Sequence, residues 1–121
     1  MIIGIGTDIV QTARLHSSLE KVRNRCFTAA EIAYAEAFKD SIGHYAGRWA
    51  AKEALAKALG CGFGQSCEWQ DIEILNNDNG KPEMRLSGKA ADTFNSLHGK
   101  TIHLSISHEK DYATAFVILE D

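Results

Sequence analysis

Alternating hydrophobic and polar positions predict β-strands at both ends of the chain. The opening segment "MIIGIGTDIV" is rich in β-branched residues and predicts a strand that ends near Asp8. Gly4 and Gly6 interrupt this strand, which indicates the close approach of another backbone or of a ligand. Near the other end, residues 101–108 and 111–120 alternate with a period of two and predict a closing pair of strands.

Helical periodicity and capping signals dominate the first half of the chain. The pattern over 12–25 is helix-like but weak. Thr28 and Glu31 have the spacing of a capping box, residues 40–44 break the pattern, and Gly60 is suited to end a helix. The expected helices are residues 28–39, about 45–59 and 89–99, and residues 12–25 are not counted as a helix in the predicted order.

The segment "EWQDIEILNNDNGKPEMRLSG" predicts a β-hairpin in the middle of the chain. Asn79-Gly80 is the turn signal, and Pro82 lies at the exit of the turn. The predicted element order is β-α-α-β-β-α-β-β with short hairpins. This order favours a single α+β domain over residues 1–121, with a mostly antiparallel sheet and helices packed on it.

Composition excludes several classes of protein. The chain has 13 basic and 16 acidic side chains, and its net charge of −3 argues against nucleic-acid binding through the overall field. No apolar run approaches 18 residues, so no membrane span is expected, and the first residues lack the features of a signal peptide. Cys26, Cys61 and Cys67 have no metal-binding spacing, which favours inert packing thiols in a reducing cytoplasm.

A few charged residues point to a magnesium and phosphate site. Asp8 ends the glycine-containing strand, and Glu53 and Lys57 lie one turn apart on one helix face. Taken singly, Asp8 is better explained as a capping carboxylate, and Glu53 with Lys57 as a solvent-exposed ion pair. Mg²⁺ prefers carboxylate oxygens and takes further ligands from phosphate, whose remaining charge suits lysine and arginine. Together with Arg48 and Lys81, the set therefore predicts a Mg²⁺–phosphate site rather than a zinc, haem or catalytic-triad site.

The strand "HLSISH" leaves two interpretations open. On a period of two, His103, Ser105 and Ser107 share one face, and His108 lies on the other face with the apolar residues. Either the hydroxyls are buried beside a ligand that His108 contacts, or they form an exposed polar face that ends in a capping histidine.

Four motifs in register make the sequence similar to a known family. "GIGTDIV", "RWAAKEALAKALG", "DIEILNNDNGKP" and "LSISH" occur in the order and spacing of the holo-[acyl-carrier-protein] synthases, the short bacterial 4′-phosphopantetheinyl transferases. Each motif alone is weak, but the resemblance covers nearly the whole chain. It implies Mg²⁺-dependent transfer of 4′-phosphopantetheine from coenzyme A to a serine of apo acyl carrier protein, releasing adenosine 3′,5′-bisphosphate. It also implies a cytoplasmic enzyme of fatty acid biosynthesis.

The resemblance implies roles for single residues. Asp8 and Glu53 resemble the carboxylates that bind Mg²⁺, and Lys57 resembles the lysine beside the coenzyme A diphosphate. Glu53 is also the candidate general base for the serine hydroxyl. The residues that resemble those at the adenosine and 3′-phosphate end are Arg48, Gly80, Lys81, Pro82 and His108.

The resemblance further implies partners. Residues 14–25 carry four basic side chains and one acidic one, and acyl carrier proteins are acidic helical bundles. Arg14, Lys21 and Arg25 are therefore expected to dock the carrier, although a charged segment is often only a solvated face. The resemblance also implies a homotrimer in which each site lies between neighbouring subunits, because this chain is half the size of its two-halved relatives.

Two departures and two rival functions accompany this hypothesis. Gln11 stands where many family members have an acid, and Trp49 stands where phenylalanine is common. A magnesium-dependent phosphohydrolase or nucleotidyl enzyme is one rival, which the basic helix disfavours. A non-catalytic coenzyme A-binding or structural module is the other, which the pair of Asp8 and Glu53 disfavours.

Overall fold

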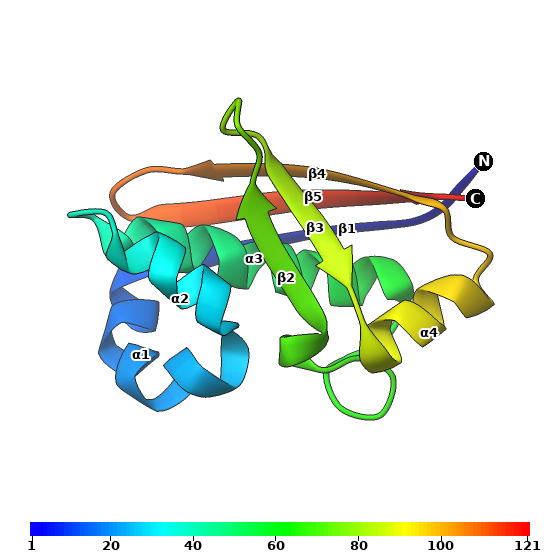
Figure 1. Cartoon of the computed structure of the whole chain (residues 1–121), viewed down its shortest axis with the longest axis horizontal. Coiled ribbons are helices and arrows are strands. Elements are labelled where there is room, and N and C mark those ends of the chain that lie inside the picture. Colours follow the sequence, from blue (N-terminus) through cyan, green and yellow to red (C-terminus); the bar gives the residue numbers. More distant parts are fainter.

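A computed structural model describes all 121 residues, and helices and strands make up most of the chain (Figure 1). The predicted α+β class is confirmed, and every strand pair is antiparallel. None of the helices is long and apolar enough to cross a membrane. The elements are β1 (Ile2–Gln11), α1 (Thr12–Cys26), α2 (Ala29–Glu36), α3 (Ser41–Leu59), the 3₁₀ turn η1 (Trp69–Asp71), β2 (Ile72–Asn76), β3 (Pro82–Leu86), α4 (Gly88–Ser96), β4 (Thr101–His108) and β5 (Tyr112–Glu120).

The strands form two sheets rather than one. β1, β5 and β4 make a three-stranded sheet in that order, and β2 and β3 form a separate hairpin. Pairing of β1 with β5 runs from Ile2 opposite Glu120 to Gln11 opposite Tyr112, so the two chain ends lie together (Figure 1). α3 lies between the three-stranded sheet and the hairpin, which makes it the central element of the fold.

Several predicted boundaries are wrong. β1 continues beyond Asp8 because its pairing with β5 extends to Gln11. The weakly patterned segment 12–25 is a full helix, so three helices and not two precede the first hairpin. The helical pattern breaks at residues 37–40 rather than at 40–44, since the Asp40 side chain accepts a hydrogen bond from Gly43 N and caps α3, which begins at Ser41. α2 and α4 each end three residues earlier than predicted.

The capping and turn predictions are confirmed. Thr28 and Glu31 form a capping box at the start of α2. Gly60 ends α3 in the left-handed conformation, with φ of 78°. Gly80 closes the β2–β3 turn with φ of 82°, and Pro82 is the first residue of β3.

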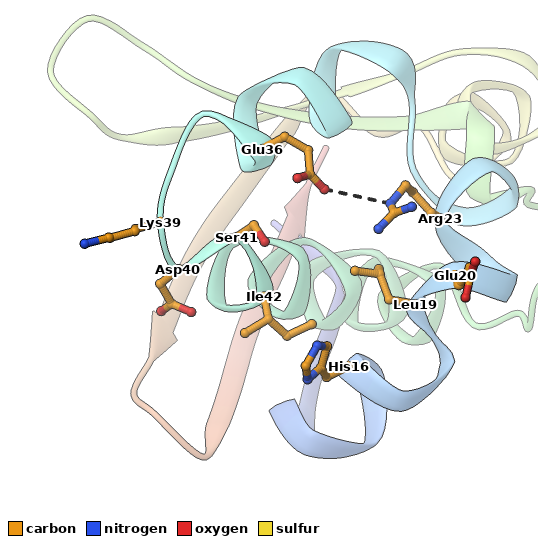
Figure 2. Close-up of a pocket in the computed structure, with 9 residues that line it drawn as sticks. All are labelled: His16, Leu19, Glu20, Arg23, Glu36, Lys39, Asp40, Ser41 and Ile42. Carbon is orange, nitrogen blue, oxygen red and sulfur yellow. Dashed lines mark ion pairs between the residues drawn. The ribbon is translucent and has the colours of Figure 1, made fainter.

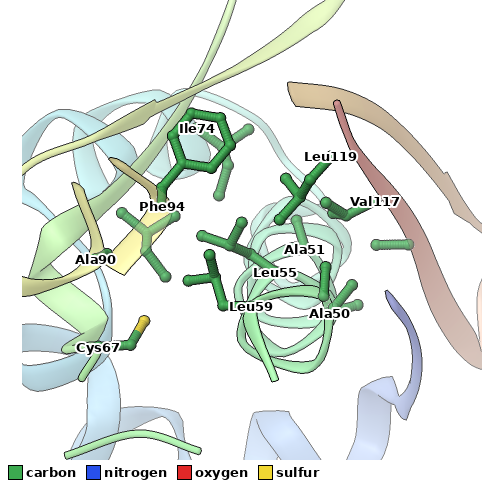
Figure 3. Close-up of a cluster of buried hydrophobic side chains, with 14 residues drawn as sticks. Ala50, Ala51, Leu55, Leu59, Cys67, Ile74, Ala90, Phe94, Val117 and Leu119 are labelled. Atoms are coloured by element: carbon green, nitrogen blue, oxygen red, sulfur yellow. The ribbon is translucent and has the colours of Figure 1, made fainter. Parts of the chain in front are cut away.

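The hydrophobic core has two parts. The larger cluster joins α3 to β5 on one side and to β2 and α4 on the other (Figure 3). The smaller one joins α1 and α2 to the first half of α3. Cys26 and Cys67 are buried within these clusters and all three cysteines are free, in agreement with packing thiols.

A buried ion pair between Lys52 and Glu31 connects the two halves of the core. Both side chains are fully buried, and Lys52 Nζ lies 2.7 Å from Glu31 Oε1. Lys52 also donates to the carbonyls of Cys26 and Trp69, while Glu31 Oε2 accepts from Ile74 N. The pair thereby links α3 to the end of α1, the start of α2, and β2. Sequence reasoning missed it, because two charged residues 21 positions apart show no pattern.

Gly4 and Gly6 let β1 lie directly against the backbone of α3. A Cβ atom at Gly4 would overlap the carbonyl oxygen of Ala58, and one at Gly6 would overlap the carbonyl oxygen of Ala54. The helix contributes only alanines at these two positions. Strand and helix therefore approach more closely than any larger side chain would permit, as the glycine pattern predicted.

Gly6→Ala is expected to destabilise the fold by about 1–3 kcal/mol or more, because β1 must move away from α3. The measurement is the free energy of unfolding in urea. Gly62→Ala is the matched control, since a Cβ there meets nothing within 4 Å. Equal stability of the two variants would show that the close approach is not required.

Candidate functional site

Three residues predicted from different parts of the chain meet in one hollow. Lys57 Nζ lies 3.2 Å from Asp8 Oδ1 and donates to the carbonyl of Thr7 at 3.0 Å. Glu53 precedes Lys57 by one helical turn and lines the same hollow, which has a volume of about 370 Å³. The residues lining it are Asp8, Ile9, Val10, Gln11, Arg14, Leu15, Ser18, Trp49, Glu53 and Lys57.

The electrostatics of this hollow favour an added cation. Burial raises the pKa of Asp8, and the Lys57 ammonium opposes that rise. Burial also raises the pKa of Glu53, and the neighbouring Asp8 carboxylate raises it further. Two half-buried carboxylates thus repel each other, and one partly exposed ammonium compensates them only in part.

The donor set fits a magnesium ion shared with a phosphate. The chain has no group of three or more His, Cys, Asp and Glu side chains placed to hold a metal. Asp8 and Glu53 instead offer two carboxylates, and Mg²⁺ is commonly bound through one or two carboxylates together with waters and substrate phosphates. These two residues would hold the ion, and Lys57 in the same hollow would be available to phosphate oxygens.

A second hollow gathers most residues predicted for the adenosine end. Arg48 and His108 line it together with Gly80 and Pro82, and its volume is about 200 Å³. Arg48 is buried, and it donates to Ile74 O at 3.1 Å and to Asn76 Oδ1 at 2.7 Å. Two residues that the prediction missed, His44 and Asn76, line the same hollow. Lys81 lies outside it and lines a neighbouring hollow beside β4.

The two hollows lie on different faces of α3. The first hollow is lined from α3 by Trp49, Glu53 and Lys57, whose spacing of four residues places them on one helix face. The second hollow is lined by His44 and Arg48, which have the same spacing and lie on another face. Arg48 and Glu53 are five residues apart, which places them about 140° apart around the helix axis. No residue lines both hollows. One chain therefore presents the two predicted parts of the site in different directions.

The predicted basic residues of α1 form a stripe. Arg14, Lys21 and Arg25 are exposed and lie on one helix face, because they are separated by seven and four residues. Arg14 also lines the hollow of Asp8, so the stripe begins at that hollow and extends about 16 Å from it. Arg23, the fourth basic residue, lies on the opposite face of α1 from this stripe. Its Nε atom is 3.8 Å from Glu36 Oε1.

The largest hollow contains none of the predicted site residues. It has a volume of about 530 Å³ and lies between α1 and the start of α3 (Figure 2). Arg23 and Glu36 approach each other inside it, and Glu36 also accepts from the hydroxyl of Tyr45 at 2.7 Å. Its lining holds charges of both signs, with the basic side chains of Arg23 and Lys39 and the acidic ones of Glu20, Glu36 and Asp40.

The serine face of β4 is exposed, so the interpretation with buried hydroxyls is wrong. Ser105 and Ser107 face outward, while Ile106 and His108 line the second hollow. The same outer face of the sheet carries large apolar side chains from β1 and β5. Their exposed fractions are 59% for Ile5, 67% for Ile9, 45% for Tyr112 and 45% for Phe116.

Comparison with known proteins gives matches over nearly the full length. A family model of the 4′-phosphopantetheinyl transferase superfamily matches residues 4–117. A holo-[acyl-carrier-protein] synthase of Cereibacter sphaeroides is 43% identical, over 99% of this chain and 93% of its own length.

Solved structures show the same similarity. A holo-(acyl-carrier-protein) synthase from Bacillus anthracis, in complex with CoA (3′,5′-ADP), is 40% identical with a TM-score of 0.85, over 98% of this chain and 96% of that chain. The holo-[acyl-carrier-protein] synthase of Neisseria meningitidis is 33% identical with a TM-score of 0.89, over the whole of both chains.

Proposed function

Because the chain belongs to the 4′-phosphopantetheinyl transferase superfamily, we propose that it is a holo-[acyl-carrier-protein] synthase. In this proposal it transfers 4′-phosphopantetheine from coenzyme A to a serine of apo acyl carrier protein. The reaction depends on Mg²⁺ and releases adenosine 3′,5′-bisphosphate. Relatives with this activity in their names, and a similar structure in complex with CoA, support the substrate.

The meeting of Asp8, Glu53 and Lys57 in one hollow carries the proposal. A diphosphate needs a divalent cation and a further positive group on the same side. Asp8 and Glu53 would hold the cation, and Lys57 is the further positive group. A module that only bound coenzyme A would not need two repelling carboxylates beside the diphosphate.

The chemistry follows from these residues. When bound, Mg²⁺ would act as a Lewis acid on the diphosphate. The serine oxygen forms a bond to the β-phosphorus, and the bond from that phosphorus to the bridging oxygen breaks. The electron pair stays on the leaving adenosine 3′,5′-bisphosphate, where Lys57 offsets the charge. Glu53 is the proposed acceptor of the serine proton, because its carboxylate lies in the same hollow as Asp8 and Lys57.

The basic stripe on α1 is the proposed docking surface for the carrier. Arg14 lies at the hollow of Asp8, and Lys21 and Arg25 follow along the helix. An acidic helix that lies along this stripe would therefore bring its serine to the diphosphate. Complementary charge of this kind mainly speeds the encounter and fixes the orientation.

Self-association into a homotrimer is the proposed assembly. Ile5, Ile9, Tyr112 and Phe116 give the outer face of the sheet an apolar character that is unusual for a monomer. The two hollows point in different directions, so a second copy is needed to bring an adenosine hollow beside the hollow of Asp8. A ring of identical copies would then contain one such junction for each chain.

The direct test is incubation with apo acyl carrier protein, coenzyme A and Mg²⁺, followed by mass spectrometry of the carrier. Asp8→Asn and Glu53→Gln are each expected to lower turnover by about 10²-fold or more, because each removes charge that holds the cation at the phosphates. Asp92→Asn, an exposed acid on α4, serves as the control and should keep full activity. Near-full activity of Asp8→Asn or Glu53→Gln at saturating Mg²⁺ would refute the role of that residue.

The same assay separates the rival functions. Breakdown of coenzyme A without any carrier, at an unchanged rate, would indicate a hydrolase. Binding of coenzyme A without either reaction would indicate a non-catalytic module. Both outcomes contradict the proposed transfer.

Arg25→Glu is expected to raise the KM for the carrier about five- to tenfold, corresponding to ~1 kcal/mol. The KM for coenzyme A should hardly change, because Arg25 lies at the end of the stripe away from the hollow of Asp8. Lys100→Glu makes the same change of charge elsewhere and is the control. The rise in carrier KM caused by Arg25→Glu should become smaller with added salt, because salt screens exposed charges beyond about 8–10 Å. An unchanged carrier KM in Arg25→Glu would mean that the stripe is only a solvated surface.

A further inference from the structure

The small hollow at the start of α3 has the size of one chemical group. Its volume of about 200 Å³ is below the ~300–1,000 Å³ of pockets that enclose a whole drug-sized ligand. Gly43, Gly47 and Gly80 form part of its wall, and a Cβ at Gly43 would lie 2.8 Å from Asp40 Oδ2 and 3.1 Å from His108 Nδ1. The hollow therefore accepts one part of a larger molecule, and the missing side chains keep it open.

The side chains that line this hollow suit an anion. Arg48 is fixed by its bonds to Ile74 and Asn76, and its guanidinium lies 4.4 Å from the ring centroid of Tyr34. His44 and His108 are the other titratable groups in the lining, with ring centroids 5.7 Å apart. No acidic residue lines the hollow. One phosphate can accept hydrogen bonds from two imidazoles at such a separation, beside a fixed guanidinium.

His44 is held in position from its other side. The centroid of its ring lies 4.0 Å from that of Phe38 and 5.5 Å from that of Tyr34, with the His44 and Tyr34 rings in an edge-on arrangement. Burial lowers the pKa of His44, Arg48 and His108 lower it further, and Asp40 opposes them. A bound anion would favour the protonated ring of His44, because its negative charge opposes the repulsion from the Arg48 guanidinium.

We propose that His44 donates a hydrogen bond to the 3′-phosphate monoester of coenzyme A, and that it helps to distinguish coenzyme A from its 3′-dephospho form. The inference rests on the proposed function, which supplies coenzyme A as the ligand. A phosphate monoester carries close to two negative charges at neutral pH, whereas the adenine base carries none. The lining of arginine and two histidines therefore fits the monoester better than the base.

The test compares the binding of coenzyme A and 3′-dephospho-coenzyme A by isothermal titration calorimetry. His44→Phe keeps an aromatic ring against Phe38 and Tyr34 but removes the N–H donors. It should weaken coenzyme A binding about five- to tenfold and leave 3′-dephospho-coenzyme A binding within about twofold. His44→Lys restores a cationic donor and should recover part of the preference. His16→Phe, on α1 and outside the hollow, is the control and should change neither affinity.

An equal loss of affinity for both compounds in His44→Phe would overturn the inference, since it would assign His44 to the base or to the fold. An unchanged preference for coenzyme A would overturn it as well. Transfer to apo carrier protein is measured on the same preparations. Failure of transfer by the wild type, with His44-dependent binding intact, would remove the proposed reaction and leave the phosphate contact standing.

Discussion

The contact between β1 and α3 is the constraint on which the candidate site depends. Gly4 and Gly6 present bare backbone to the alanine-lined side of α3, and any larger residue would separate the two elements. Because β1 and α3 lie so close together, the Asp8 carboxylate, in the second half of β1, contacts Lys57 on the helix. Glu53 lines the same hollow. Two carboxylates and an ammonium from distant parts of the sequence thus share one hollow, because two glycines of β1 lie directly against alanines of α3.

α3 performs three tasks on different faces. Lys52 points into the core, where the ion pair with Glu31 joins α1, α2 and β2 to the helix. Breaking a buried pair of this kind leaves an uncompensated charge and typically costs about 3–5 kcal/mol. Glu53 and Lys57 point toward β1, and Arg48 points toward the β2–β3 hairpin. The rigid core around Lys52 therefore fixes the directions of the two hollows, and their separation is the physical reason to expect a site completed by a second copy.

Local signals explain what the sequence could predict. The capping box at Thr28, the left-handed Gly60 and the alternation of the closing strands all depend on neighbouring residues, and each was confirmed. The first turn of α3 was missed because its cap at Asp40 precedes a glycine, which resembles a break. His44 was not predicted as a site residue, because the predicted helix began after it. Only when α3 begins at Ser41 does His44 lie one turn before Arg48 on the same helix face. The division into two hollows could not be predicted, because it depends on how α3 is oriented within the fold.

Mixed assemblies of two inactive variants test most directly whether one site combines two copies of the chain. Asp8→Asn removes a metal carboxylate from one hollow, and His108→Glu repels phosphate from the other. The two variants, carrying different tags, are expressed together, and assemblies that contain both are purified over both tags. In a trimer of this kind one of the three junctions has both parts intact, so about a third of wild-type transfer activity is expected. Mixed assemblies without activity, or no assembly that carries both tags, would contradict the account.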